Sequence, residues 1–153
     1  MIQFTLSSQP IDSSQMSHLL ANSTAGALVT FEGWVRNHND GKEVLGLEYE
    51  VYEILAYKEG EKILQEAQAK FNLAGAVACH RYGYLDIGEI AVWVGTTGVH
   101  RGSAFAGTRY IINGIKSRLP IWKKEFYFGE KPQWILCSAN HGFSSSSHTD
   151  RER

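Results

Sequence analysis

The sequence has few cysteines, no long hydrophobic run and almost no net charge. Its two cysteines, Cys79 and Cys137, show no CxxC spacing, which excludes a disulfide framework and predicts reduced thiols in a soluble, cytoplasmic protein. No stretch approaches the roughly 18 apolar residues of a membrane-spanning helix, and the first residues, MIQFTLSSQP, lack the features of a signal peptide. The formal net charge of −1 argues against a general nucleic-acid-binding protein, although it leaves room for a local cationic pocket.

The hydrophobic pattern predicts a single α+β domain over residues 1–140, with mixed or antiparallel strands, hairpins and three main helices. Strand patterns occur at residues 2–6, 26–35, 44–52, 75–83, 89–96, 121–128 and 133–137. Helical patterns occur at residues 10–20, 54–71 and 100–118, with Ile54, Leu55 and Phe105 on the predicted apolar faces. The four tryptophans are all assigned to the core. Residues 141–153 are predicted to be a disordered tail, because SSSSHTDRER has no apolar side chain to offset the entropy of ordering.

Four cationic positions are candidates for chemistry: Arg36, the pair His100-Arg101, Lys116 and Lys123. The His100-Arg101 pair follows a Gly-rich turn and opens a predicted helix, where unsatisfied N–H groups and the helix dipole favour a bound anion. Two cations at that helix end are otherwise unfavourable. Either a bound anion offsets the repulsion, or the pair is simply solvated.

Lys116 and Lys123 flank the tight turn at Pro120, which ends the last helix. Taken singly, each fits the ordinary role of a helix-dipole partner or of a solvated strand residue. As a pair in one pocket, they would lower each other's pKa, which is how a lysine becomes a base or nucleophile near neutral pH. Because side chains alternate along a strand, only one of Lys123 and Lys124 can line such a pocket, and both remain candidates at this point.

Arg101 and Lys116 are too far apart to contact one small substrate within a single chain. They are 15 positions apart on one predicted helix, which is roughly 22 Å at 1.5 Å per residue. If both serve one site, a second copy of the chain must supply one of them, which predicts a dimer with shared sites.

Arg36 ends a strand before a hairpin, so it is either a pocket residue or an ordinary surface arginine. The histidines show no metal-ligand spacing, so no metal site is predicted, and Cys79 and Cys137 are interpreted as small buried hydrophobic residues.

Five stretches resemble the molybdopterin synthase large-subunit family: GALVTFEGWVRNHNDG, LEYEVY, HRYGYLDIGE, VGTTGVHRGSAF and IKSRLPIWKKE. They lie in family order within about residues 3–137, and the VRNHN and K-x-R-x-P-x-W-K-[KR]-E elements weigh most. The resemblance implies an α/β hammerhead-like fold. It also implies a sulfurtransferase that converts cyclic pyranopterin monophosphate into molybdopterin, with no metal or other cofactor at this step.

The resemblance further implies partners and site residues. Sulfur would arrive as a thiocarboxylate on the C-terminal Gly-Gly of a small ubiquitin-like subunit, in a heterotetramer built on a homodimer of large subunits. Carried over by motif, Arg36, Lys116 and Lys123 bind substrate in a pocket that receives this tail, and Lys116 and Lys123 are catalytic. His100 and Arg101 would bind substrate from the neighbouring large subunit. The resemblance thus selects Lys123 over Lys124.

The sequence departs from the family at one position. Ser138 stands where family members carry an arginine after the last strand, which leaves either His141 as a replacement or a phosphate site with fewer contacts. Two other functions stay open: a phosphate-ester enzyme that needs no protein partner, and a non-catalytic module that binds a protein through an aromatic edge. Of the three functions, only the molybdopterin synthase function predicts a dithiolene product that depends on both the thiocarboxylated partner and the cyclic pyranopterin.

Overall fold

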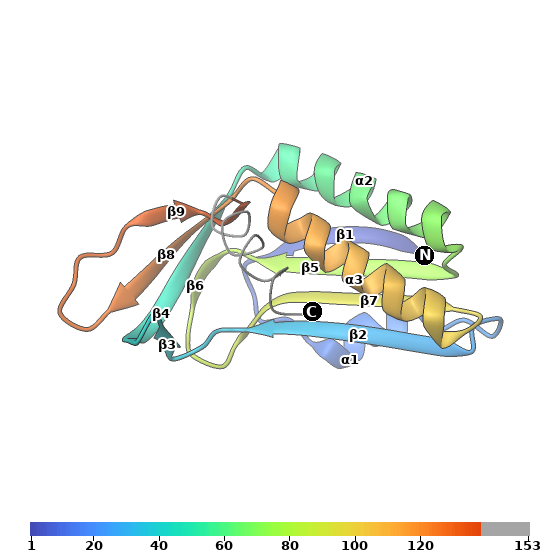
Figure 1. Cartoon of the computed structure of the whole chain (residues 1–153), viewed down its shortest axis with the longest axis horizontal. Helices are drawn as coiled ribbons and strands as arrows, with labels where there is room; N and C mark the ends of the chain where they lie inside the picture. The colour runs from blue at the N-terminus through green and yellow to red at the C-terminus, as the bar shows by residue number, and fades with distance from the viewer. Residues whose placement is uncertain (139–153) are drawn as a thin grey trace, which may run out of the picture.

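The computed structural model describes residues 1–138 and arranges them around two β-sheets (Figure 1). The four-stranded sheet has the order β1 (Ile2–Ser7), β5 (Gly75–Arg81), β7 (Ile90–Gly98) and β2 (Ala27–Trp34). The five-stranded sheet has the order β3 (His38–Asn39), β4 (Lys42–Val51), β8 (Ile121–Tyr127) and β9 (Trp134–Leu136), with β6 (Gly83–Leu85) also paired to β4. The β1–β5 pair is parallel and the other pairs are antiparallel, which confirms the predicted α+β class.

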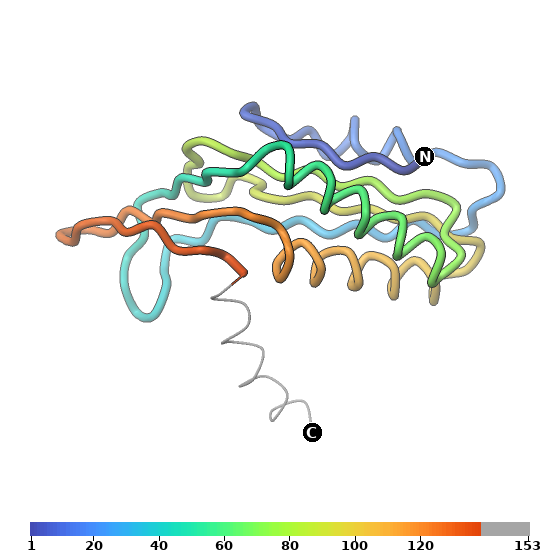
Figure 2. The backbone as a smooth tube through the Cα atoms, turned by 90° about the horizontal axis from the view of Figure 1, so that it is seen from above, coloured from blue at the N-terminus to red at the C-terminus, as the bar shows by residue number. Residues whose placement is uncertain are grey.

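Three helices cover the four-stranded sheet. The long helices α2 (Glu53–Phe71) and α3 (Arg101–Arg118) pack on one face, and α1 (Ser13–Leu19) lies on the other, away from α3 (Figure 2). Asp12 caps the start of α1: its side chain accepts hydrogen bonds from the N–H groups of Ser14 and Gln15. Helix α3 ends before Pro120, because Leu119 is extended.

The main hydrophobic core lies between the two long helices and the four-stranded sheet, and a smaller cluster around Trp93 lies under α1. Strands β5 and β7 are covered on both faces, so almost every residue in them is buried. The predicted strand over residues 75–83 is two strands, because Gly83 has a φ of 86° and turns the chain from the first sheet into the second.

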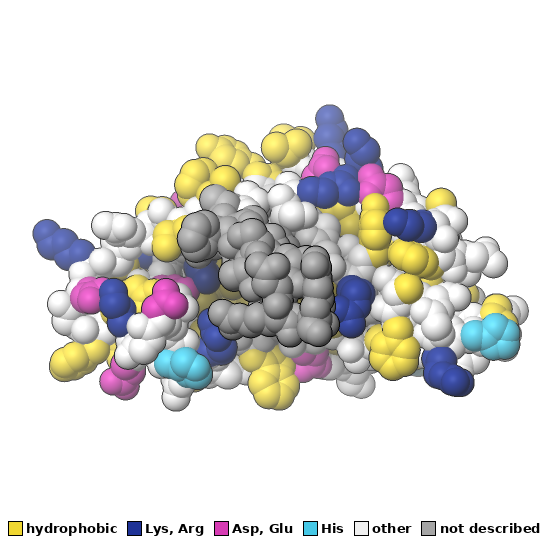
Figure 3. Space-filling model, in the orientation of Figure 1, with side chains coloured by type: hydrophobic (Ala, Val, Ile, Leu, Met, Phe, Trp, Pro, Cys, Tyr) yellow, Lys and Arg dark blue, Asp and Glu magenta, His cyan; other side chains and the backbone are white. Residues whose placement is uncertain are grey.

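The predicted apolar helix faces need a correction. Ile54, Leu55 and Phe105 are exposed to 81%, 53% and 61%. Helix α2 faces the sheet with a stripe at four- and three-residue spacing that excludes both Ile54 and Leu55. Figure 3 shows hydrophobic side chains at the surface over the start of α2. The buried residues of this stripe are Ala56, Gly60, Ile63, Leu64 and Ala67.

The assignment of all four tryptophans to the core is also wrong. Trp93 is fully buried in β7, but Trp34 and Trp134 are 65% and 39% exposed. Trp34 ends β2, which is an edge strand, and Trp134 lies in the short strand β9 at the end of the other sheet. Tryptophan has a high β propensity, so it fits both strands, but a strand at the edge of a sheet does not bury it.

The predicted tail over residues 141–153 lies outside the described residues, as do positions 139 and 140 of the predicted domain. Within residues 1–138, no helix is both long and apolar enough to cross a membrane.

Gly60→Ala is expected to destabilise the fold by about 1–3 kcal/mol, because a Cβ at this position would overlap the ring of Phe4 in the core. Gly102→Ala is the matched control, since a Cβ there meets nothing within 4 Å. The control should be neutral, or stabilising by up to about 1 kcal/mol, from its higher helix propensity. Urea unfolding of both variants checks the difference, and equal midpoints would contradict this view of the α2–β1 packing.

Candidate active site

A pocket of about 150 Å³ lies where the end of β2, strands β4 and β8 and the last turn of α3 meet. It brings together Arg36, Lys116 and Lys123, three of the five residues that the sequence nominates. The complete lining consists of Trp34, Val35, Arg36, His38, Asn39, Val44, Leu47, Tyr49, Lys116, Lys123 and Glu125.

Three local features aim the cations into this pocket. Arg36 follows the edge strand β2, and Lys116 lies in the last turn of α3, which runs toward the five-stranded sheet (Figure 1). After the turn at Pro120 the chain returns as β8, where Lys123 pairs with Tyr49 of β4. The Pro120 turn therefore holds Lys116 and Lys123 at one end of the domain.

Strand alternation separates Lys123 from Lys124. Lys123 lines the pocket. Lys124 lies 3.7 Å from a carboxylate oxygen of Glu48, and its Nζ is 4.5 Å from the centre of the Trp134 ring. The resemblance-based choice of Lys123 thus agrees with the geometry, because only Lys123 among these two residues lines the pocket.

Glu125 is a buried carboxylate that fixes Lys123. Its side chain is 7% exposed, and Oε1 lies 2.8 Å from the Lys123 Nζ. The Tyr127 hydroxyl donates at 2.7 Å, and the Asn39 amide donates at 3.2 Å. Burial alone would raise the pKa of Glu125, but the hydrogen bonds from Lys123, Tyr127 and Asn39 outweigh it and lower the pKa. Glu125 therefore stays charged and holds the Lys123 ammonium in one place.

Lys116 is in a different electrostatic position. Burial lowers its pKa, Cys137 acts in the opposite direction, and repulsion from Lys123 and Arg36 lowers the pKa further. Among residues 1–138, Lys116 forms no ion pair. The lowered pKa of Lys116 and its place beside Lys123 are what the sequence analysis expects of two lysines that share one pocket.

His100 and Arg101 lie at the other end of α3 from the pocket (Figure 1). Both side chains are exposed, and His100 precedes the helix without capping it through its side chain. The rise of an α-helix separates Arg101 from Lys116 by roughly 22 Å. A single chain therefore does not bring His100 and Arg101 into the pocket.

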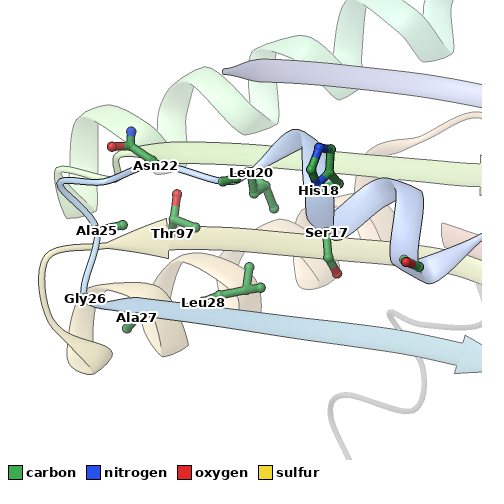
Figure 4. A pocket seen from close by; sticks show the side chains of 11 residues that line it. Ser17, His18, Leu20, Asn22, Ala25, Gly26, Ala27, Leu28 and Thr97 are labelled. Atoms are coloured by element: carbon green, nitrogen blue, oxygen red, sulfur yellow. The ribbon is translucent and has the colours of Figure 1, made fainter.

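A larger pocket of about 490 Å³ lies between α1 and the ends of β2 and β7 that are remote from Lys116 (Figure 4). It has no Lys, Arg, Asp or Glu in its lining, so it offers no fixed charge to an anion. Size alone would favour this pocket, but the charges identify the smaller one as the candidate active site. Elsewhere in residues 1–138, no group of three or more His, Cys, Asp or Glu side chains gathers as metal ligands would.

Sequence reasoning missed Glu125 and Tyr49 as pocket residues. Glu125 could have been found from alternation, because it lies two residues after Lys123 on the same face of β8. Tyr49 could be placed only from the pairing register between β4 and β8.

Of the two thiols, Cys79 is buried as predicted, whereas Cys137 is only partly buried, and burial raises the pKa of both. Ser138 is partly buried, and His141 lies outside the described residues.

Comparison with known proteins gives a consistent set of relatives. A family model described as MoaE protein matches residues 6–118. A molybdopterin synthase catalytic subunit from Thermoplasma volcanium is 43% identical over 110 residues, which are 72% of this chain and 80% of the relative. The Bacillus subtilis protein of the same name is 38% identical, with 88% and 85% of the two chains covered. The crystal structure of molybdopterin synthase from Staphylococcus aureus superposes with a TM-score of 0.80 at 35% identity, covering 88% of this chain and 98% of that one.

Proposed function

We propose, since the chain belongs to the MoaE protein family of molybdopterin synthase catalytic subunits, that it builds the dithiolene of molybdopterin. Sulfur would pass from the C-terminal thiocarboxylate of a small ubiquitin-like subunit to cyclic pyranopterin monophosphate. The observation that carries the proposal is the meeting of Arg36, Lys116 and Lys123 in one pocket. Three cations opposite the single carboxylate of Glu125 suit a phosphate and a thiocarboxylate, both of which are anions.

The proposed roles follow from the setting of each side chain. Arg36 binds the cyclic phosphate, because a planar guanidinium can hold two oxygens at once. Lys116 assists sulfur attack as an acid/base or as an electrostatic stabiliser, since it is partly buried and, within residues 1–138, forms no ion pair with a carboxylate. Lys123, held by Glu125, keeps a fixed positive charge beside the reacting groups.

The second half of the site comes from a second copy of the chain. Strand β2 runs along the open edge of its sheet, and it pairs only with β7 among the described strands. Its Leu28, Phe31 and Trp34 are 47%, 37% and 65% exposed, and alternation puts Leu28 and Phe31 on opposite faces, so this open edge carries apolar surface on both sides, which suits a self-interface. A two-fold contact along β2 would set the Ala27 end of one copy beside the Trp34 end of the other. His100 and Arg101, near that first end, would then reach the pocket of the neighbour.

The same proposal covers the other partner and the compartment. The relatives are named as catalytic subunits, a name that presupposes a further subunit. Two large subunits with two small ones would form a heterotetramer. Both cysteines are free thiols, which fits the reducing cytoplasm.

Reconstitution tests the function directly. The purified chain is mixed with a thiocarboxylated small subunit and cyclic pyranopterin monophosphate, and the dithiolene product is measured. Product should form only when both additions are present. Turnover of the pterin phosphate without the small subunit would instead support the phosphate-ester alternative and overturn the proposal.

Lys123→Met is expected to reduce dithiolene formation by about 100-fold, because it removes one fixed positive charge from the pocket. Lys124→Met is the matched control, since it removes the same charge from the neighbouring residue on the other face of β8, outside the pocket lining, and should leave turnover within about twofold. Single-turnover assays of the two variants measure the contrast. Equal losses would show that the pocket face of β8 is not where the chemistry occurs.

A further inference from the structure

Tyr49 is a buried polar residue of the pocket to which the family resemblance assigns no role. Its side chain is 7% exposed, lines the pocket, and stands opposite Lys123 in the β4–β8 pairing. No hydrogen bond among the described residues involves its hydroxyl, and this oxygen is not among the fully enclosed polar atoms that lack a partner, so it opens onto the pocket. A phenol whose ring is buried and whose hydroxyl opens into a cationic pocket can hydrogen-bond a ligand there in place of water.

His80 fixes the orientation of the Tyr49 ring. The two rings meet edge to face, with 4.9 Å between their centroids and an interplanar angle of 88°. His80 is 2% exposed, and its Nδ1 lies 2.7 Å from the carbonyl oxygen of Arg81. A carbonyl can only accept, so Nδ1 carries the proton. Burial lowers the pKa of His80 to about 4, so the ring is neutral near neutral pH. The Tyr49 hydroxyl is thus positioned before a substrate arrives.

The phenol keeps its proton throughout the working pH range. Burial raises the pKa of Tyr49, and the nearby Cys137 and Glu125 raise it further. Tyr49 therefore presents an O–H donor that does not titrate, beside lysines whose charge can change. Such a donor stabilises negative charge on an oxygen without needing a base.

We propose that the Tyr49 hydroxyl contacts the substrate and donates a hydrogen bond to an anionic oxygen held in the pocket. This inference rests on the proposed function for the identity of that oxygen. It belongs either to the cyclic phosphate or to the thiocarboxylate, which share the chemistry of an anionic acceptor. In either case Tyr49 is a binding residue in addition to the cationic set.

Tyr49→Phe tests the inference, because it removes only the hydroxyl and keeps the ring that packs on His80. We expect kcat/KM to fall by about 10- to 100-fold, the usual cost of losing one hydrogen bond to a charged group. Tyr84→Phe is the control, since Tyr84 is 51% exposed on β6 and outside the pocket lining; it should stay within about twofold, as for a surface change. A rise in KM for the pterin assigns the contact to the phosphate, and a rise in KM for the small subunit assigns it to the thiocarboxylate. Tyr49→Phe with wild-type kinetics would overturn the inference.

A second measurement separates this inference from the proposed function. The ¹³Cζ signal of Tyr49, identified by its loss in Tyr49→Phe or by proximity to the His80 ring, is followed while inorganic phosphate is added to the wild-type chain. If the wild-type chain makes no dithiolene, the proposed function fails, and the signal alone decides: movement supports the contact, and a fixed signal refutes it. If the chain is active, the kinetics of Tyr49→Phe decide. The titration also serves if that variant does not fold.

Discussion

Replacement of Lys116 by methionine should stop dithiolene formation while leaving the fold and the dimer intact. Lys116 is the pocket lysine that forms no ion pair within residues 1–138, and its pKa is lowered, so we expect it to exchange a proton or to face the reacting sulfur. We expect turnover to drop by about 10²- to 10⁴-fold, the range for loss of an acid/base or charge-stabilising group. Lys58→Met, an exposed change on α2, is the control. Near-normal turnover of Lys116→Met would remove Lys116 from the mechanism.

The same substitution should make the protein more stable near neutral pH. The folded state lowers the pKa of Lys116, so the unfolded chain binds the proton more tightly than the native one. Wild-type stability is therefore reduced at lower pH, and it recovers as the pH rises through the folded pKa toward the ordinary lysine value of about 10.4. Methionine has no charge to bury, so the gain in Tm should be largest near neutral pH and shrink as the pH rises. A variant that is less stable at every pH would contradict this account.

Two inactive variants should restore each other's activity when their chains are mixed. In Arg101→Ala one half of each shared site is lost, and in Lys116→Met the other half is lost. If Lys116 comes from one copy and Arg101 from the other, as proposed, a mixed dimer carries one doubly altered site and one intact site. Random exchange makes half of the dimers mixed, so about one quarter of the wild-type activity should return.

This experiment needs unfolding and refolding of the two variants together, followed by the reconstitution assay. Each variant refolded alone is the control and should remain inactive. If the mixture gains nothing although mixed dimers are detected by mass spectrometry, Arg101 and Lys116 do not meet across a dimer, and the role of α3 in two sites is wrong.

Much of the fold follows from local signals in the sequence. The Asp40-Gly41 pair predicts the β3–β4 turn, because Asp and Gly tolerate positive φ well, and both residues do have positive φ, at 50° and 74°. Asp12 and Pro120 mark the start of α1 and the end of α3 for equally local reasons. The exposure of Ile54 and Trp34 was not predictable in this way. It depends on which side of α2 meets the sheet and on β2 being an edge strand, and both are set by tertiary packing.

The site divides in the same manner. The motifs in the sequence predict the three cations of the pocket, Arg36, Lys116 and Lys123. Alternation along β8 explains why Lys123 lines the pocket and Lys124 does not. Tyr49 could not be predicted, because its place beside Lys123 depends on pairing between strands far apart in the chain. Composition also gives no hint that a buried carboxylate, Glu125, would hold Lys123.

In a dimer of the proposed kind, each α3 helix contributes one end to the active site of its own chain and the other end to that of its neighbour. Arg101 at its first residue would serve the neighbour, and Lys116 in its last turn would serve its own chain. A shift of α3 when substrate binds at one site would move a cation of the other site, so the two sites need not work independently. Both sites then depend on the length of α3, because deleting one turn would displace a cation by about 5.4 Å and impair both sites.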